Sequence, residues 1–249
     1  MLVNPQSEFL REPNLLIPNK KPIGTVKIDW SHPMTKALKA VVIGGYQINL
    51  VTGEQLVSRN TGVPLVNSKA FEFNSVDALE AEIGLLPTLE WTLFTRCTGG
   101  IDGSVGAGTL FGVGTNLLQF NRGFDIYYSL GKFRYLIRGV GGTLINLFGS
   151  ASYIKGVPEN ICAVTRSNVD HKIFVGGIEV ASSTSNITGK DVETYANIVI
   201  LGAAITSNLN VEPSDADAIV EVGFTFYRGL TDEEVKSLHD DPYQFIISA

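Results

Sequence analysis

Short runs of β-branched and aromatic residues recur along most of the chain, separated by glycine, asparagine, serine and aspartate. In residues 90–98, Trp91 and Leu93 share one face while Thr92 and Phe94 share the other, as expected of a strand. Similar runs cover residues 25–30, 36–45, 71–74, 109–114, 117–123, 124–130, 132–139, 160–167, 171–183, 196–203 and 218–229, and two short strands are expected within residues 46–56. A spacing of about ten residues between such runs is typical of an all-β sandwich or barrel rather than of alternating βα units.

One stretch near the C-terminus has the signals of a helix instead. Thr231 precedes the acidic residues Asp232, Glu233 and Glu234. A threonine at the N-cap with a glutamate three residues later is a capping box, and acidic side chains suit the positive end of the helix dipole. These carboxylates are therefore interpreted as residues that start a helix rather than as catalytic acids.

The predicted helix has an apolar face and a defined end. Val235 and Leu238 share one face and, with Leu230, are expected to hold the helix against the sandwich. Pro242 stops the helix. By contrast, the polar and acidic residues 211–218 are expected to form a loop.

The first 22 residues differ from the rest of the chain. Pro5, Pro13, Pro18 and Pro22 exclude a helix there and favour extended backbone. Glu8 and the prolines are also unlike a signal peptide. We therefore predict an extended N-terminal arm over residues 1–22, which lies on its own domain or on a neighbour, and one all-β domain over residues 23–249.

Composition narrows the class of protein. The 44% apolar content of the 249 residues is enough for a sizeable core. The net charge of −6, without a cluster of lysine and arginine, argues against a nucleic-acid partner. No apolar run reaches the roughly 18 residues of a membrane span, so no membrane partner is expected. Cys97 and Cys162 lie in apolar runs and are interpreted as buried free thiols.

Several motifs, taken in order, resemble the laminin-G-like, concanavalin A-like jelly rolls. Residues 226–245, FYRGLTDEEVKSLHDDPYQF, resemble the last strand and terminal helix of that family. Residues 172–183, KIFVGGIEVASS, resemble its hairpin, with Gly176 where asparagine is usual. Residues 71–82 and 90–97 resemble two earlier strands, although Asn74 and Leu79 depart from the pattern. The resemblance implies an antiparallel jelly-roll β-sandwich over about residues 25–245.

The opening of the domain is similar to that of jelly-roll proteins encoded by tailed bacteriophages and prophages. The motif is KPIGTVKIDWSHPMTKAL, from Lys21 to Leu38. Such proteins are virion components on heads or tails. This resemblance implies a virion protein made in the bacterial host cytoplasm, whose partners are other virion proteins reached through the N-terminal arm. Head and tail locations both stay open, as does a homo-oligomeric state.

Enzymatic chemistry is not expected. Glucanases of this superfamily place two carboxylates on one strand in a Glu-x-Asp-x-Glu pattern. The nearest match is Glu80-Ala81-Glu82, which lacks the middle acid and is interpreted as a solvated edge. We therefore predict no catalytic residues and no enzyme; a glycan depolymerase is the least favoured alternative.

Other candidate motifs have structural interpretations. His32 belongs to a Ser-His-Pro turn, His171 precedes a strand, and His239 ends the predicted helix, so no catalytic triad is expected. Residues 106–112, GAGTLFG, lack the lysine of a phosphate loop. The sequon Asn186-Ile187-Thr188 is expected to be unmodified.

Two kinds of ligand stay open. Calcium would need oxygen ligands from loops, and the candidates are Asp102, Asp191, Asp215 and Asp217, but their spacing singles out no site, so no cofactor is assigned. A sugar would need an aromatic platform beside a polar side chain, and the candidates are Trp91, Tyr127, Tyr128 and Tyr135, most of which are expected in the core. The sequence thus favours a non-enzymatic virion structural protein, with a carbohydrate-binding module as the alternative.

Overall fold

The computed structural model describes residues 20–22, 24–58, 65–66, 70–73, 79–84, 90–99, 108–114, 123–129, 132–139, 142–149, 156–188, 198–201, 203–205, 211–213 and 218–249. Of the predicted N-terminal arm, only Lys20, Lys21 and Pro22 are among these residues. The predicted extended conformation of residues 1–19 lies outside the described residues. The predicted strand over residues 117–123 also lies outside them, except for Gly123.

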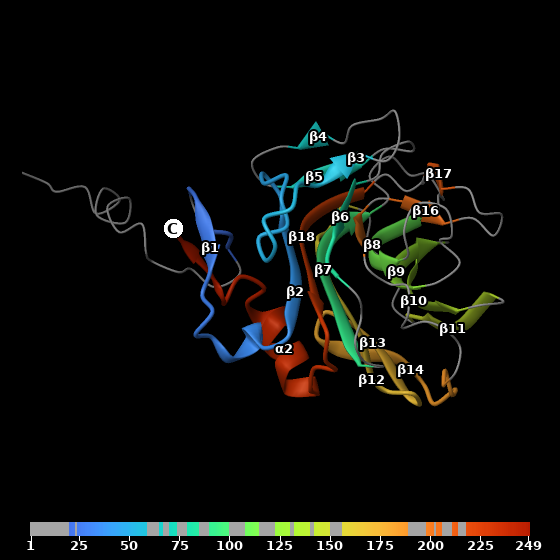
Figure 1. The fold of residues 1–249 in the computed structure, drawn as a ribbon. Helices are drawn as coiled ribbons and strands as arrows, with labels where there is room; N and C mark the ends of the chain where they lie inside the picture. Colours follow the sequence, from blue (N-terminus) through green and yellow to red (C-terminus); the bar gives the residue numbers. More distant parts are fainter. Residues whose placement is uncertain are drawn as a thin grey trace, which may run out of the picture.

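Two antiparallel sheets face each other in the body of the molecule (Figure 1). The seven-stranded sheet has the order β11 (Gly142–Phe148), β10 (Lys132–Gly139), β9 (Gly123–Ser129), β8 (Gly108–Gly114), β15 (Ile198–Leu201), β6 (Leu79–Glu82) and β3 (Val57–Ser58). The eight-stranded sheet has the order β14 (Ile178–Ser183), β13 (Asp170–Val175), β12 (Glu159–Ser167), β7 (Trp91–Gly99), β18 (Ala218–Phe226), β5 (Phe71–Phe73) and β4 (Leu65–Val66), and β2 (Leu38–Ile43) also pairs with β18. The all-β antiparallel sandwich predicted from the sequence is confirmed.

Strand β18, close to the end of the chain, lies in the middle of its sheet. It pairs with β7 along one edge and with β2 and β5 along the other. A bulge separates Val220, opposite Cys97, from Val222, opposite Arg96. The extra residue turns Val220 toward the seven-stranded sheet and Val222 toward the opposite face. One strand therefore contributes to two hydrophobic cores.

The inner core fills the space between the two sheets. As predicted, Trp91 and Leu93 of β7 face into this core, and Phe94 faces the other way. The Trp91 ring stacks on Phe124 of the opposite sheet, with centroids 4.3 Å apart. Burial of each such large side chain stabilises the fold by about 1.5–3 kcal/mol.

A second, outer core covers the other face of the eight-stranded sheet. Helix α2 (Asp232–Asp240) packs there, together with a two-stranded sheet of β1 (Val26–Ile28) and β19 (Ile246–Ser248) and the 3-10 turn η1 (Pro33–Thr35) (Figure 1). Its buried members include Val41, Ile43, Phe94, Val222, Phe224, Phe226, Leu230, Val235, Leu238, Phe245 and Ile246. The predicted helix and its contacts through Leu230, Val235 and Leu238 are confirmed, and so is the Thr231–Glu234 capping box.

Two local predictions were wrong, and one strand was not predicted. Residues 142–148 form strand β11, which the sequence did not indicate. The expected loop over residues 211–218 begins with strand β17 (Val211–Pro213), which pairs with β16 (Ala203–Ile205). Pro213 is tolerated because it is the terminal residue of a two-stranded ladder. The two strands expected within residues 46–56 reduce to a single bridge between Ile48 and Gln55.

Candidate functional site

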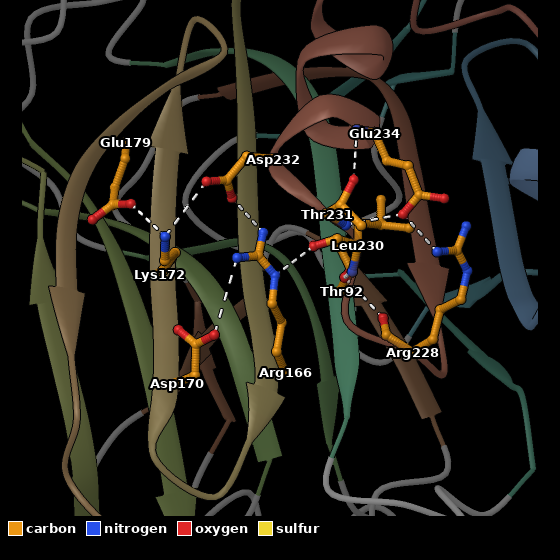
Figure 2. A network of polar contacts seen from close by, with 10 residues as sticks. All are labelled: Thr92, Arg166, Asp170, Lys172, Glu179, Arg228, Leu230, Thr231, Asp232 and Glu234. Carbon is orange, nitrogen blue, oxygen red and sulfur yellow. Dashed lines mark hydrogen bonds and ion pairs between the residues drawn. The ribbon is translucent and has the colours of Figure 1, made fainter.

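The charged residues at the start of α2 form a network of ion pairs with the sheet (Figure 2). Arg166 donates to the carboxylate of Asp232 and, through Nε, to the carbonyl of Leu230 at 2.7 Å. Lys172 Nζ lies 2.7 Å from Glu179 Oε2 and 3.6 Å from Asp232 Oδ2. The hydrogen bond from Arg166 holds the pKa of Asp232 below its ordinary value. Asp232 thereby joins the helix to Arg166 of β12 and Lys172 of β13, which supports its structural interpretation.

The same network continues on the far side of the helix start. Arg228 Nη1 donates to Glu234 Oε2 at 2.7 Å, and Thr92 joins the segment through hydrogen bonds with Arg228 O and Leu230 N (Figure 2). Each charge drawn in this network has an opposite partner, which supports a structural interpretation of these residues.

A buried chain of hydrogen bonds crosses the inner core. Trp91 Nε1 lies 2.6 Å from Tyr135 Oη, which lies 2.7 Å from Thr165 Oγ1, which lies 3.0 Å from His171 Nδ1. His171 Nε2 lies 3.1 Å from Asn168 O and 3.0 Å from Ser185 O. Since carbonyls only accept, Nε2 carries the hydrogen of the neutral ring and Nδ1 accepts from Thr165. Burial lowers the pKa of His171, which favours this neutral form.

This chain accounts for most of the predicted aromatic and histidine candidates. Trp91, Tyr135 and His171 are fully buried and Tyr128 is also in the inner core. The other two histidines are structural as well. His32 Nδ1 caps η1 by accepting from Met34 N at 3.2 Å, and the carbonyl of His239 accepts from Asn160 at 2.9 Å. Of the four sugar-binding candidates, only Tyr127 faces away from the core.

The two candidate carboxylates, Glu80 and Glu82, lie on the same face of β6. Leu79 and Ala81 of β6 face the inner core, so Glu80 and Glu82 point to the outer face of the seven-stranded sheet. Glu82 is exposed, but Glu80 is buried and β6 lies between β15 and β3, so the interpretation of this motif as a solvated edge was wrong for Glu80. In the same row of the sheet, Asp125 lies three strands away, with its backbone about 14 Å from that of Glu80. Glycosidases place their carboxyl groups about 5–10 Å apart.

A row of side chains on the outer face of β8–β11 has the composition of a ligand site. Thr109, Tyr127, Arg134 and Phe148 lie directly opposite one another on four successive strands. All four point outward, because their neighbours Ile126, Phe133 and Leu147 face the inner core. We call Tyr127, Arg134 and Phe148 the aromatic–arginine row.

The aromatic–arginine row opens progressively toward β11. Thr109 is buried, Tyr127 and Arg134 are partly exposed, and Phe148 is 46% exposed. The guanidinium of Arg134 lies over the Phe148 ring, with Cζ 4.1 Å from the ring centroid. This contact fixes the orientation of Arg134 and stabilises its charge. The row thus combines an aromatic surface with an oriented cation.

A buried ion pair between Asp125 and Arg138 lies beside the aromatic–arginine row on β9 and β10. The carboxylate of Asp125 accepts from Thr109 Oγ1 at 2.7 Å and lies 3.8 Å from Arg138 Nη2. Burial raises the pKa of Asp125, although Arg138 and Thr109 counteract this effect. Gly112 leaves the space that Asp125 fills, since a Cβ there would meet the Asp125 Cβ at 2.7 Å.

Only one residue of the aromatic–arginine row was predicted as a candidate from the sequence. Tyr127 was a candidate, but Arg134 and Phe148 were not. The alternation of residues 132–139 places Arg134 on one face of its strand. Phe148 belongs to the strand that was missed, and its place opposite Arg134 depends on a bulge between Ile137 and Arg138. No pattern in the sequence marks that bulge.

The calcium candidates and the two cysteines are the predicted residues that remain. The calcium candidates Asp102, Asp191, Asp215 and Asp217 lie outside the described residues. Within the described part of the chain, no three or more histidine, cysteine, aspartate or glutamate side chains gather into a metal site. Cys97 and Cys162 are buried free thiols, as predicted, and burial raises the pKa of both. No described helix is long and apolar enough to span a membrane.

Comparison with known proteins finds similarity at the level of structure. No protein-family model and no curated protein matches the sequence. A Trypanosoma rangeli sialidase matches 84% of this chain over 34% of its own, with a TM-score of 0.63 and 15% identity. The receptor-binding domain of botulinum neurotoxin C/D mosaic serotype matches 82% of this chain over 51% of its own, with a TM-score of 0.61 and 11% identity. The binding domain of Paraclostridial Mosquitocidal Protein 1 gives 0.61 and 15% identity, over 84% of this chain and 53% of its own.

These likenesses are to β-sandwich proteins, and at such identities they show the fold alone. The chain spans about a third of the sialidase and about half of each of the two binding-domain structures. The narrower resemblances to laminin-G-like and phage proteins remain predictions from the sequence motifs.

Proposed function

We propose that this chain is a non-enzymatic binding module that recognises a glycan on the outer face of β9–β11, and that it acts as a component of a bacteriophage virion. The observation that carries the proposal is the aromatic–arginine row of Tyr127, Arg134 and Phe148. Partly exposed aromatic rings beside a few oriented polar groups are what ligand sites require. Two of the structural neighbours are a receptor-binding domain of a botulinum neurotoxin and the binding domain of Paraclostridial Mosquitocidal Protein 1, and another is a sialidase, which supports a binding role on this fold.

Glycan binding by the purified chain tests the first part of the proposal. An array of bacterial and environmental glycans is expected to reveal a ligand, and Tyr127→Ala is expected to weaken that binding at least about tenfold. Trp30→Ala is the matched control, because Trp30 is a 57% exposed aromatic residue that follows β1 in the sequence. Strand β1 lies on the other side of the molecule from β9–β11 (Figure 1). Silence across a broad array, or equal losses in the two variants, would count against a glycan site on this face.

The virion role rests on the sequence motif from Lys21 to Leu38. In this proposal the N-terminal arm attaches the module to other virion proteins of the head or tail, and the sandwich displays the binding face. Removal of residues 1–22 in the phage genome is expected to abolish incorporation into particles, as measured by mass spectrometry of purified virions. Normal incorporation of the shortened chain would contradict attachment through the arm.

The absence of an enzymatic role is also part of the proposal. The separation of Glu80 and Asp125 and the buried ion pair of Asp125 with Arg138 support it. The expected result is that no polysaccharide is shortened on incubation with the chain. Depolymerisation that is lost in Glu80→Gln or Glu82→Gln would overturn this part of the proposal and leave the binding face untouched.

A further inference from the structure

Arg134 is a partly buried cation without a counter-ion in the part of the chain that the structure describes. Its Nε atom is buried and has no hydrogen-bond partner. The other arginine on this face of β10, Arg138, has Asp125 at 3.8 Å. A buried donor without a partner costs free energy, and native proteins rarely leave one unless a ligand or another group satisfies it.

The local charge of this face is opposite to that of the whole chain. On the outer face of β9–β11, the described side chains include Lys132, Arg134 and Arg138, with Asp125 as the opposing acid. The whole chain carries a net charge of −6. A basic patch on an acidic protein attracts anions locally while the rest of the surface repels them.

We propose that Arg134 is the anion-binding residue of this face, and that the ligand is an acidic glycan whose sugars carry carboxylates. The inference rests on the proposed glycan-binding function and names its ligand class. The planar fork of a guanidinium matches a carboxylate through two parallel hydrogen bonds. The side chain of Arg134 is partly exposed, and its buried Nε has no hydrogen-bond partner in the described structure.

The rings of Phe148 and Tyr127 flank Arg134 on the two neighbouring strands. Phe148 holds the guanidinium by stacking at 4.1 Å and acts as a positioning residue. Tyr127 lies opposite Arg134 on the other neighbouring strand, about 5 Å away between backbones. A carboxylate bound by Arg134 therefore brings its sugar ring against an aromatic side chain.

Matched pairs of glycans test the inference directly. An array holds each carboxylate-bearing glycan beside its carboxyl-reduced neutral counterpart, with sulfated glycans and a DNA duplex as other polyanions. The chain is expected to bind acidic members in preference to neutral ones, and to bind them more weakly as salt is raised. Arg134→Gln is expected to weaken the acidic binding about 10- to 100-fold.

Lys132→Gln is the matched control, because it removes the same charge from an exposed residue of the same strand face. It is expected to change the affinity less than about threefold. Arg134→Lys keeps the charge without the fork and is expected to fall between the two, and it also serves if Arg134→Gln does not fold. Thermal unfolding of each variant checks that the fold is retained.

The outcomes separate this inference from the proposal on which it rests. Equal binding of acidic and neutral partners would overturn the carboxylate specificity but leave glycan binding intact. Equal losses in the Arg134 and Lys132 variants, or equal binding of sulfated glycans and DNA, would overturn it in favour of unselective charge attraction. Binding to no glycan at all would remove the proposed function itself.

Discussion

Single hydroxyl groups hold the inner core in register across the two sheets. Thr165 Oγ1 lies between Tyr135 Oη and His171 Nδ1, and both partners are buried. Thr165→Val removes the hydroxyl but keeps the shape, so two buried polar groups lose a partner at about 1–3 kcal/mol each. We expect the free energy of unfolding in urea to fall by about 2–6 kcal/mol. Thr165→Ser keeps the hydroxyl and is expected to lose far less; similar losses in both variants would show that the hydrogen bonds contribute little.

Gly177, in the turn between β13 and β14, is required for two separate reasons. Its φ of +76° is unfavourable for other residues, and a Cβ there would lie 2.9 Å from Cδ2 of His239. Gly177→Ala is therefore expected to lower the free energy of unfolding by about 1–3 kcal/mol. Gly156 has a similar φ of +75° but open space around it, so Gly156→Ala isolates the backbone effect. An equal loss in both variants would mean that the contact with His239 does not matter.

At the scale of the element, the ion-pair network at the start of α2 makes its attachment sensitive to acid. The hydrogen bond from Arg166 lowers the pKa of Asp232 in the folded state. This contribution is therefore complete above the ordinary aspartate pKa of about 3.9 and is lost as pH falls through the lowered value. We expect Asp232→Asn to reduce the melting temperature most above about pH 5, with the difference vanishing near about pH 2.

Asp240→Asn provides the comparison for that pH series. Asp240 pairs with Lys236 on the exposed surface of the same helix and does not join the helix to the sheet. Its replacement is expected to have a smaller effect at every pH. If both variants gave the same pH profile, the network in Figure 2 would not be what fastens α2.

The elements that could be predicted from the sequence are those with strong local signals. The capping box of Thr231 and Glu234 fixed the start of α2, and the alternation in β7 correctly assigned Trp91 and Phe94 to opposite faces. Strand β11 was missed because its apolar residues do not alternate cleanly, with Leu144 and Ile145 adjacent. The candidate site depends on pairing between strands and on the Ile137/Arg138 bulge, which tertiary packing decides.

At the scale of the whole molecule, two strands that are far apart in the sequence pair with each other. Strand β1, which follows the arm, pairs with the C-terminal strand β19, and Asp29 N donates to Phe245 O at 2.9 Å. Phe245 is fully buried in the outer core, 4.9 Å from Phe224 between ring centroids. The attachment of the N-terminal segment to the body therefore depends on residues more than two hundred positions away.

This dependence predicts what loss of the last residues does to the first ones. Without residues 246–249, β1 has no strand to pair with in the described structure, so trypsin is expected to cleave after the exposed Lys27 much faster. Phe245→Ala is expected to expose the same bond and to lower the free energy of unfolding by about 3–5 kcal/mol. Phe148→Ala, at a 46% exposed position, is the control and is expected to cost less than about 1 kcal/mol. Unchanged cleavage after Lys27 in the truncated chain would mean that β1 is held by the arm or by η1, because neither is altered by the truncation.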